Sequence, residues 1–269
     1  PERLAAERGG ALEGLAWLGR TPEVRASRLV RILAVLARGL LFGVLRFRIE
    51  RSGRELLPPG GYLLVGAVHR GWIDPFLILD SLPLEPWVWF LGSGPSAFDR
   101  RWKEWLLHRV GGMLPVWRGG VGVDQHVASA RAVVEAGGVF VLLPEGGVAG
   151  PPDRLAPFRT GGALIALRTG ARIVPFVMVG GEELYLGKRF ATRILAPTTA
   201  AELLGPAWDG LTSEPGTRTE LDLAERLTMR FADLLGPEVV ELYPRTVDAP
   251  GRPRRLRGLT RLLLPRRRR

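Results

Sequence analysis

The residues best suited to acid–base chemistry lie in the segment AVHRGWIDPF, where His69 precedes Asp74 by five positions. A neutral imidazole can take up a proton near neutral pH, and a carboxylate that accepts its other ring N–H fixes the tautomer. The same pair has a structural interpretation, because Asp is a preferred N-cap and Pro75 a preferred first helical residue. The segment therefore indicates either a general base with an orienting carboxylate or simply the start of a helix after a strand.

Short apolar runs alternate with helical patterns from residue 62 onward. This alternation predicts a single α/β domain with a largely parallel central sheet flanked by helices. Because His69 and Glu145 each follow a predicted strand, we expect both at the carboxyl edge of that sheet, where sites in such folds gather. Strands are predicted at 62–68, 87–91, 113–117, 139–144 and 172–179, with a possible further strand at 189–195, and helices at 75–82, 98–110, 123–136, 160–169 and 217–236.

Three later segments carry distinctive residues at or near strand ends. Arg118 follows the run GMLPVW, Glu145 and Gly146 follow Pro144 in LLPEGG, and Pro175 lies inside IVPF. Proline within a strand is typical of an edge or a bulge. Together with the His–Asp segment, these four blocks resemble, in order and in spacing, those of the glycerolipid acyltransferases, the family that acylates glycerol 3-phosphate and lysophosphatidic acid.

The resemblance implies a role for each matching residue. His69 would be the general base that deprotonates an acceptor hydroxyl, and Asp74 would orient it. Arg118 would bind the acceptor phosphate, which charge-assisted contacts favour. Glu145 and Gly146 would organise the acceptor site. The donor would be acyl-CoA or acyl-carrier protein, with no further cofactor.

The chain also departs from the pattern of the family. Where the family commonly continues Pro-Glu-Gly with Thr-Arg-Ser, this chain has Gly147, Val148 and Ala149. A cation expected near the acceptor phosphate is therefore missing. Arg154 or Arg159 could supply that charge, and the family often has a basic residue at the position of Arg159. The residues Val68 and Gly71 also replace the usual Asn and Ser near the histidine.

The composition excludes several other kinds of site. The chain has no Cys, which excludes thiolate nucleophiles, disulfides and Cys-based zinc sites. Only three His and no dense carboxylate cluster argue against a catalytic metal. No Gly-x-Ser-x-Gly elbow occurs, which argues against a hydrolase of that class.

Most of the net charge of +11 belongs to the C-terminal segment. Residues 251–269 hold nine of the 38 basic residues and no acid, which leaves 29 basic against 27 acidic residues elsewhere. Arginine interleaved with leucine suits an anionic membrane surface, although a solvated tail that improves solubility is an equal alternative. No aromatic platform accompanies the basic run, so nucleic-acid binding is not expected.

An apolar helix is predicted over 28–50, with Arg28, Arg31, Arg38 and Arg46 along one stripe. Its longest charge-free runs are too short to span a bilayer. A basic stripe against a broad apolar face is typical of a helix in the membrane interface. The alternative is a helix packed on the protein's own core with arginines at the rim.

The sequence thus predicts an N-terminal segment with an interfacial helix (1–50), an acyltransferase domain (51–246) and an Arg-rich tail (247–269). We expect a peripheral membrane enzyme at the cytoplasmic face that acylates a lysophospholipid such as 1-acylglycerol 3-phosphate. Two alternatives are an acyltransferase with a glycolipid or aminolipid acceptor and a non-catalytic lipid-binding protein of the same fold.

Overall fold

The computed structural model describes residues 21–93, 112–116, 123–148, 150–208 and 217–247. The central feature is a sheet with the strand order β1-β7-β6-β2-β5-β3-β4. The strands are β1 (Arg48–Ser52), β2 (Tyr62–Ala67), β3 (Val88–Ser93), β4 (Met113–Val116), β5 (Val139–Leu142), β6 (Ile173–Val179) and β7 (Arg189–Ile194). The helices are α2 (Thr21–Val44), α3 (Asp74–Ser81), α6 (Val123–Glu135), α7 (Gly161–Thr169), α8 (Ala200–Leu204) and α9 (Arg218–Leu242), with 3₁₀ turns at Arg54–Leu56, Gly205–Ala207 and Tyr243–Thr246.

The sheet is mostly parallel, as the alternating pattern predicts. Strands β4, β3, β5, β2 and β6 all run in one direction. Only the β6–β7 pair is antiparallel, and β1 lies parallel to β7. The carboxyl ends of β2, β5 and β6, which are neighbours in the order β5-β2-β6, therefore meet at one edge of the sheet.

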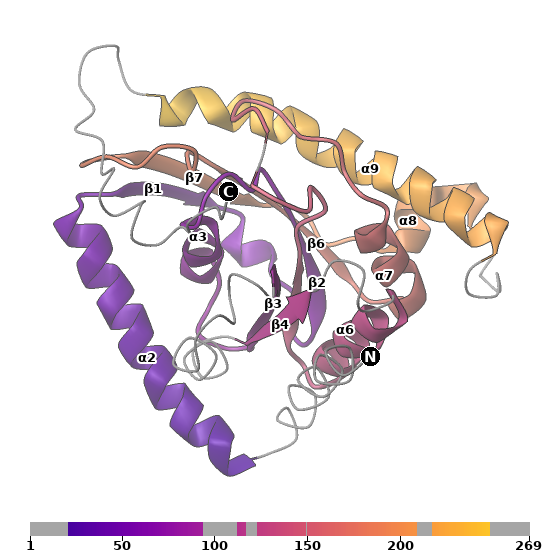
Figure 1. Cartoon of the computed structure of the whole chain (residues 1–269), viewed down its shortest axis with the longest axis horizontal. Helices are drawn as coiled ribbons and strands as arrows, with labels where there is room; N and C mark the ends of the chain where they lie inside the picture. The colour runs from indigo at the N-terminus through magenta and orange to yellow at the C-terminus, as the bar shows by residue number, and fades with distance from the viewer. Residues whose placement is uncertain (1–20, 94–111, 117–122, 149, 209–216, 248–269) are drawn as a thin grey trace, which may run out of the picture.

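Strand β2 separates two layers of apolar side chains. Leu63 and Val65 belong to the cluster that packs against α6, α7 and α9, whereas Tyr62 and Leu64 belong to the cluster beneath α3. This alternation is the two-residue period of a strand buried on both faces. Figure 1 shows α6, α7, α8 and α9 gathered on one side of the sheet and α3 on the other.

Pro175 lies inside the sheet, on β6, rather than on an edge strand. The ladder between β6 and the chain around β7 is irregular beside it. Phe176 is paired with Ile194 and Ile173 with Thr198, so three steps along β6 match four on the partner. The Pro175 carbonyl accepts the Leu195 N–H at 2.9 Å, and proline has no N–H to return. The sequence offers two explanations for a proline in a strand, an edge or a bulge, and the structure supports the bulge.

Two expectations at the start of the chain need correction. The helix predicted over 28–50 ends at Val44, and Arg48–Ser52 forms strand β1, which is paired with β7. The sequence RIERS of β1 has no apolar pattern that would predict a strand, because four of its five residues are exposed. It forms a strand through parallel pairing with β7, which is distant in the sequence.

The arrangement of α2 also contradicts the alternative in which its apolar face packs on the protein's own core and its arginines lie at the rim. Arg31 and Arg38 face the domain, with side chains only 4% and 11% exposed. Arg31 donates to Glu85 at 3.4 Å and to the Leu84 carbonyl, and its guanidinium lies over the Trp87 ring. Arg38 lies 3.3 Å from Asp80. Arginines therefore hold α2 to the domain.

The exposed side of α2 is apolar. Between 37% and 71% of the surface of each of these large side chains is exposed: Leu29, Ile32, Leu33, Val35, Leu36, Leu40, Leu41 and Val44. Phe42 is buried, in a cluster with Ile73 and Leu77 of the α3 region. A packed core helix with arginines at its rim is thus not what the structure shows. In the part of the chain that the structure describes, no helix combines the length and apolarity needed to cross a bilayer.

Candidate active site

The turn that carries His69 begins at a strained residue. Strand β2 ends at Ala67, and Val68 has φ of 66°, in the left-handed region that β-branched residues avoid. Such a conformation costs about 1–3 kcal/mol and persists only where the surroundings enforce it. Val68 is 2% exposed and belongs to the main apolar cluster, so packing holds it there. The strained turn reverses the chain from β2 toward α3.

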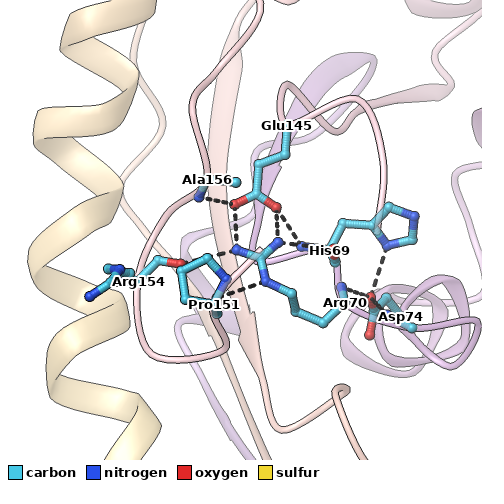
Figure 2. A network of polar contacts seen from close by, with 8 residues as sticks. His69, Arg70, Asp74, Glu145, Pro151, Arg154 and Ala156 are labelled. Carbon is cyan, nitrogen blue, oxygen red and sulfur yellow. Dashed lines mark hydrogen bonds and ion pairs between the residues drawn. The ribbon is translucent and has the colours of Figure 1, made fainter. Parts of the chain in front are cut away.

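His69 and Asp74 form a hydrogen-bonded pair at the end of this turn (Figure 2). His69 Nδ1 lies 2.8 Å from Asp74 Oδ2, and the same oxygen accepts the Arg70 N–H at 2.6 Å and the Gly71 N–H at 2.8 Å. An ionised carboxylate only accepts, so Nδ1 carries the ring hydrogen. Nε2 is left with its lone pair, and no described residue forms a hydrogen bond to it. The imidazole is 19% exposed and can therefore meet a substrate.

The structure also decides the role of Asp74 in its helix. Helix α3 begins at Asp74 itself, with Ile73 as the N-cap and Pro75 following. The bonds from the Asp74 carboxylate go back to the turn before the helix, at His69, Arg70 and Gly71. The helix-capping interpretation of the pair is therefore wrong. The carboxylate, 1% exposed, fixes the shape of the histidine turn instead.

Glu145 reaches the same turn from the neighbouring strand. β5 pairs with β2 in parallel, with Val65 opposite Leu142, so the segments after the two strands emerge side by side. Glu145 Oε2 accepts the His69 backbone N–H at 2.9 Å, and Oε1 accepts the Ala156 N–H at 3.0 Å. The sequence predicts that His69 and Glu145 meet, because each follows a strand of the sheet. The structure shows this contact.

Arg70 is the partner of Glu145 that the sequence interpretation missed. Its guanidinium contacts both carboxylate oxygens, with Nη2 3.0 Å from Oε1 and a short contact from Nη1 to Oε2. Nε donates to the Pro151 carbonyl at 2.8 Å, and Nη2 also donates to the Arg154 carbonyl at 3.0 Å. Both side chains are 2% exposed or less. Figure 2 shows this ion pair joining three loops beside the turn that carries His69.

No local pattern marks Arg70 in the sequence, because an arginine next to a turn is usually exposed. Its burial depends on the loop at 151–156, more than eighty positions away. With four donors already on its two oxygens, Glu145 is placed to shape the site rather than to bind a substrate directly.

Gly146 and Arg159 lie against each other beyond Glu145. Gly146 has φ of 67°, in the left-handed region that favours glycine, and a Cβ there would lie 2.7 Å from Arg159 Nε, so a side chain at this position would displace the Arg159 guanidinium. The Arg159 backbone N–H donates to the Pro144 carbonyl at 2.8 Å. The Arg159 side chain is exposed, and among the described residues no acid pairs with it. The structure thus brings together His69, Asp74, Glu145, Gly146 and Arg159, whereas Arg118 lies outside the described residues.

Val148, at the position where the family has arginine, is 48% exposed. The segment after Glu145 therefore presents an apolar side chain where a cation was expected, and Arg159 supplies a cation close by. Among the described residues no group of three or more His, Asp and Glu is placed to hold a metal ion.

The chain is similar to a known protein family and to solved structures. Residues 48–179, from β1 to the end of β6, match the model of the family described as Acyltransferase. The solved structure of the 1-acyl-sn-glycerophosphate (LPA) acyltransferase PlsC from Thermotoga maritima is similar over 79% of each chain, with 18% sequence identity and a TM-score of 0.49. No curated protein sequence matches the chain.

Proposed function

Because this chain belongs to the acyltransferase family that its four ordered motifs indicated, we propose that it transfers a fatty acyl group from a thioester donor to a lysophospholipid hydroxyl. The observation that carries this proposal is the His69–Asp74 pair, joined at 2.8 Å at the carboxyl end of β2. The donor would be acyl-CoA or acyl-carrier protein, and 1-acylglycerol 3-phosphate is the model acceptor.

The proposed reaction is a direct transfer without a covalent enzyme intermediate. His69 Nε2 takes the proton from the acceptor hydroxyl as its oxygen attacks the thioester carbonyl. The tetrahedral intermediate collapses, the C–S bond breaks, and the imidazolium returns the proton to the leaving thiolate. Asp74 holds the hydrogen on Nδ1 and stabilises the imidazolium while it exists.

The acceptor's phosphate needs a cation from elsewhere in the chain, because this chain has Val148 where the family commonly has arginine. We propose that Arg159 takes over this charge, since it lies against Gly146 and has an exposed guanidinium. Arg118, which follows β4 in the sequence and lies outside the described residues, would supply a second cation. An acceptor that carries less charge, such as a glycolipid or aminolipid, is the alternative that Val148 favours.

Membrane attachment is the second part of the proposal. We infer that the apolar face of α2 (the eight exposed residues from Leu29 to Val44) lies in the lipid interface. A contiguous exposed apolar face of this kind is rare on monomeric soluble proteins. Arg31 and Arg38 are bound to the domain, which fixes the orientation of the helix. The protein would then be peripheral, at the cytoplasmic face.

The test of the proposed reaction is product analysis. The purified full chain would be offered palmitoyl-CoA with a panel of lysolipids that includes lysophosphatidic acid, a lysoglycolipid and a lysoaminolipid, and the products would be measured by mass spectrometry. Acylation of a lysophospholipid is the expected result. Acylation of the other lysolipids alone would support the alternative acceptor class, and no acylated product from any lysolipid would favour the non-catalytic alternative.

A further inference from the structure

The two oxygens of the Asp74 carboxylate have very different surroundings. Oδ2 accepts three N–H groups, whereas Oδ1 is buried and, among the described residues, has no hydrogen-bond partner. An ionised carboxylate oxygen readily accepts hydrogen bonds, and a buried one that accepts none requires a physical explanation. The position of Oδ1 is therefore set by packing and not by hydrogen bonds.

Gly181 lies against Oδ1. It is the second residue after β6, at the same edge of the sheet as His69. A Cβ at this position would lie 3.2 Å from Asp74 Cγ and well inside van der Waals contact with Oδ1. Protein interiors are packed too densely for such an overlap to be absorbed without movement. The carboxylate keeps its place only because residue 181 has no side chain.

The contact is reciprocal, because Gly71 meets Gly181 from the other side. A Cβ at Gly71 would lie 2.5 Å from the Gly181 carbonyl oxygen. The histidine turn and the segment after β6 therefore pack backbone against backbone. Asp74 has no room to yield, since its side chain is 1% exposed and it sits beside the fully buried Ile73. Any shift of the carboxylate would weaken three hydrogen bonds to Oδ2.

We propose that Gly181 is a positioning residue that sets the orientation of Asp74 and, through it, the tautomer of His69. The proposal rests on the proposed function insofar as that function makes His69 the base. A methyl group at position 181 would displace the carboxylate, lengthen the 2.8 Å contact with Nδ1 and allow the imidazole to adopt its other tautomer. A misplacement of about 1 Å at a catalytic site can cost about 100-fold in rate.

The experiment uses the full chain with Gly181→Ala and, as a matched control, Gly236→Ala in α9. A Cβ at Gly236 would meet only Leu155 Cδ1 at 3.7 Å, an ordinary contact. With palmitoyl-CoA and the lysolipid accepted by the wild type, Gly181→Ala should lower kcat about 100-fold and leave both KM values within about twofold. A binding residue would instead change KM, and the control should leave both constants near their wild-type values.

A second readout does not depend on the substrate. The chain has three histidines, so ¹⁵N NMR of the imidazoles can follow His69, identified by its loss in His69→Gln. We expect the Nδ1–H tautomer in the wild type and a substantial Nε2–H population in Gly181→Ala. This measurement stands even if no lysolipid is acylated, so failure of the proposed function and failure of this inference are distinguishable.

A double variant keeps the proposal testable if Gly181→Ala folds poorly. Asp74→Ala removes the carboxylate, so adding Gly181→Ala to it should change neither the melting temperature nor the residual rate by much, because coupled residues are non-additive. If Gly181→Ala lowers the melting temperature and the rate as much in the Asp74→Ala background as in the wild-type background, the proposal is overturned. So would a folded Gly181→Ala protein with wild-type kcat and an unchanged His69 tautomer.

Discussion

The Asp74 carboxylate fixes both the backbone of the histidine turn and the imidazole ring through a single oxygen. Asp74→Asn can keep an oxygen in the place of Oδ2 for all three N–H groups, but it removes the negative charge that stabilises the imidazolium formed when His69 takes up a proton. We therefore expect kcat to fall about 100-fold or more, while the melting temperature by circular dichroism changes little. Near wild-type turnover in Asp74→Asn would show that the negative charge of Asp74 is unimportant for the reaction.

Arg159 is the residue at which the acceptor prediction can be tested. If it binds the acceptor phosphate, Arg159→Ala should raise the acceptor KM by about tenfold to 100-fold, because a hydrogen bond to a charged group contributes about 1.5–3 kcal/mol. The donor KM should stay within about twofold. Steady-state kinetics with each substrate varied in turn measure both constants.

Val148→Arg is the complementary variant, since it restores the cation that the family has at this position. If the native acceptor lacks a phosphate there, this change should improve activity on lysophosphatidic acid and impair the native reaction. Efficient use of lysophosphatidic acid by a wild type that is indifferent to Arg159→Ala would contradict the role of Arg159.

For individual residues, the sequence was sufficient to predict which of those that follow strands would lie close together. His69 and Glu145 could be expected to meet because each follows a strand of a parallel sheet. Arg70 and Gly181 could not be found in this way, because their roles depend on contacts with the loop at 151–156 and with Asp74 that no local pattern encodes. An arginine in a turn and a glycine after a strand are ordinary features until the fold places them.

At the scale of elements, the Arg70–Glu145 pair joins the segments after β2 and β5 to the loop at 151–156. Glu145→Gln would leave a buried guanidinium without its counter-charge, which typically costs about 3–5 kcal/mol. We expect a loss of this size in the free energy of unfolding measured by urea denaturation. As a control, Arg245→Ala breaks exposed ion pairs to Glu50 and Glu241 and should cost about 1 kcal/mol or less. Equal losses for the two variants would contradict the structural role of the buried pair.

The sequence predicted the buried elements better than the exposed ones. β2, β5 and β6 are fully buried, and their apolar runs identified them. Helix α9 was expected to end at Gly236 but continues through Pro237 to Leu242. Its buried stripe, which includes Leu235, Val239 and Leu242, continues past the proline, so packing outweighs the missing backbone hydrogen bond.

At the scale of the whole molecule, the helical wheel gave the amphipathic character of α2 but not the direction of each face. A pattern with one basic and one apolar side does not say which side meets the domain. The acidic residues Asp80 and Glu85, together with Trp87, select the arginine side. The apolar side is then left exposed, on a helix that lies at the outside of the molecule (Figure 1).

Two changes test whether α2 and the basic tail together attach the protein to a membrane. Leu36→Glu with Leu40→Glu places charge on the most exposed part of α2, where these side chains are 63% and 71% exposed. Co-sedimentation with anionic vesicles should fall at least about tenfold, because burying charge in the interface is costly. Val240→Glu on α9, at a residue 65% exposed, is the matched control and should bind as the wild type does.

Removal of residues 251–269, which lie outside the described part of the chain, should weaken vesicle binding and make the remainder less sensitive to salt. If the α2 variant and the protein without the tail both bind vesicles as the wild type does, membrane attachment through these two segments is contradicted.

The most direct test of the central claim is the turnover number of His69→Ala, compared with that of the wild type on the same thioester donor and lysolipid acceptor. Loss of a general base typically costs about 10²–10⁴-fold in rate. We predict a loss in this range, with an unchanged circular dichroism spectrum, because His69 is partly exposed and its side chain does not support the core. A folded His69→Ala protein that turns over near the wild-type rate would contradict the account of this site.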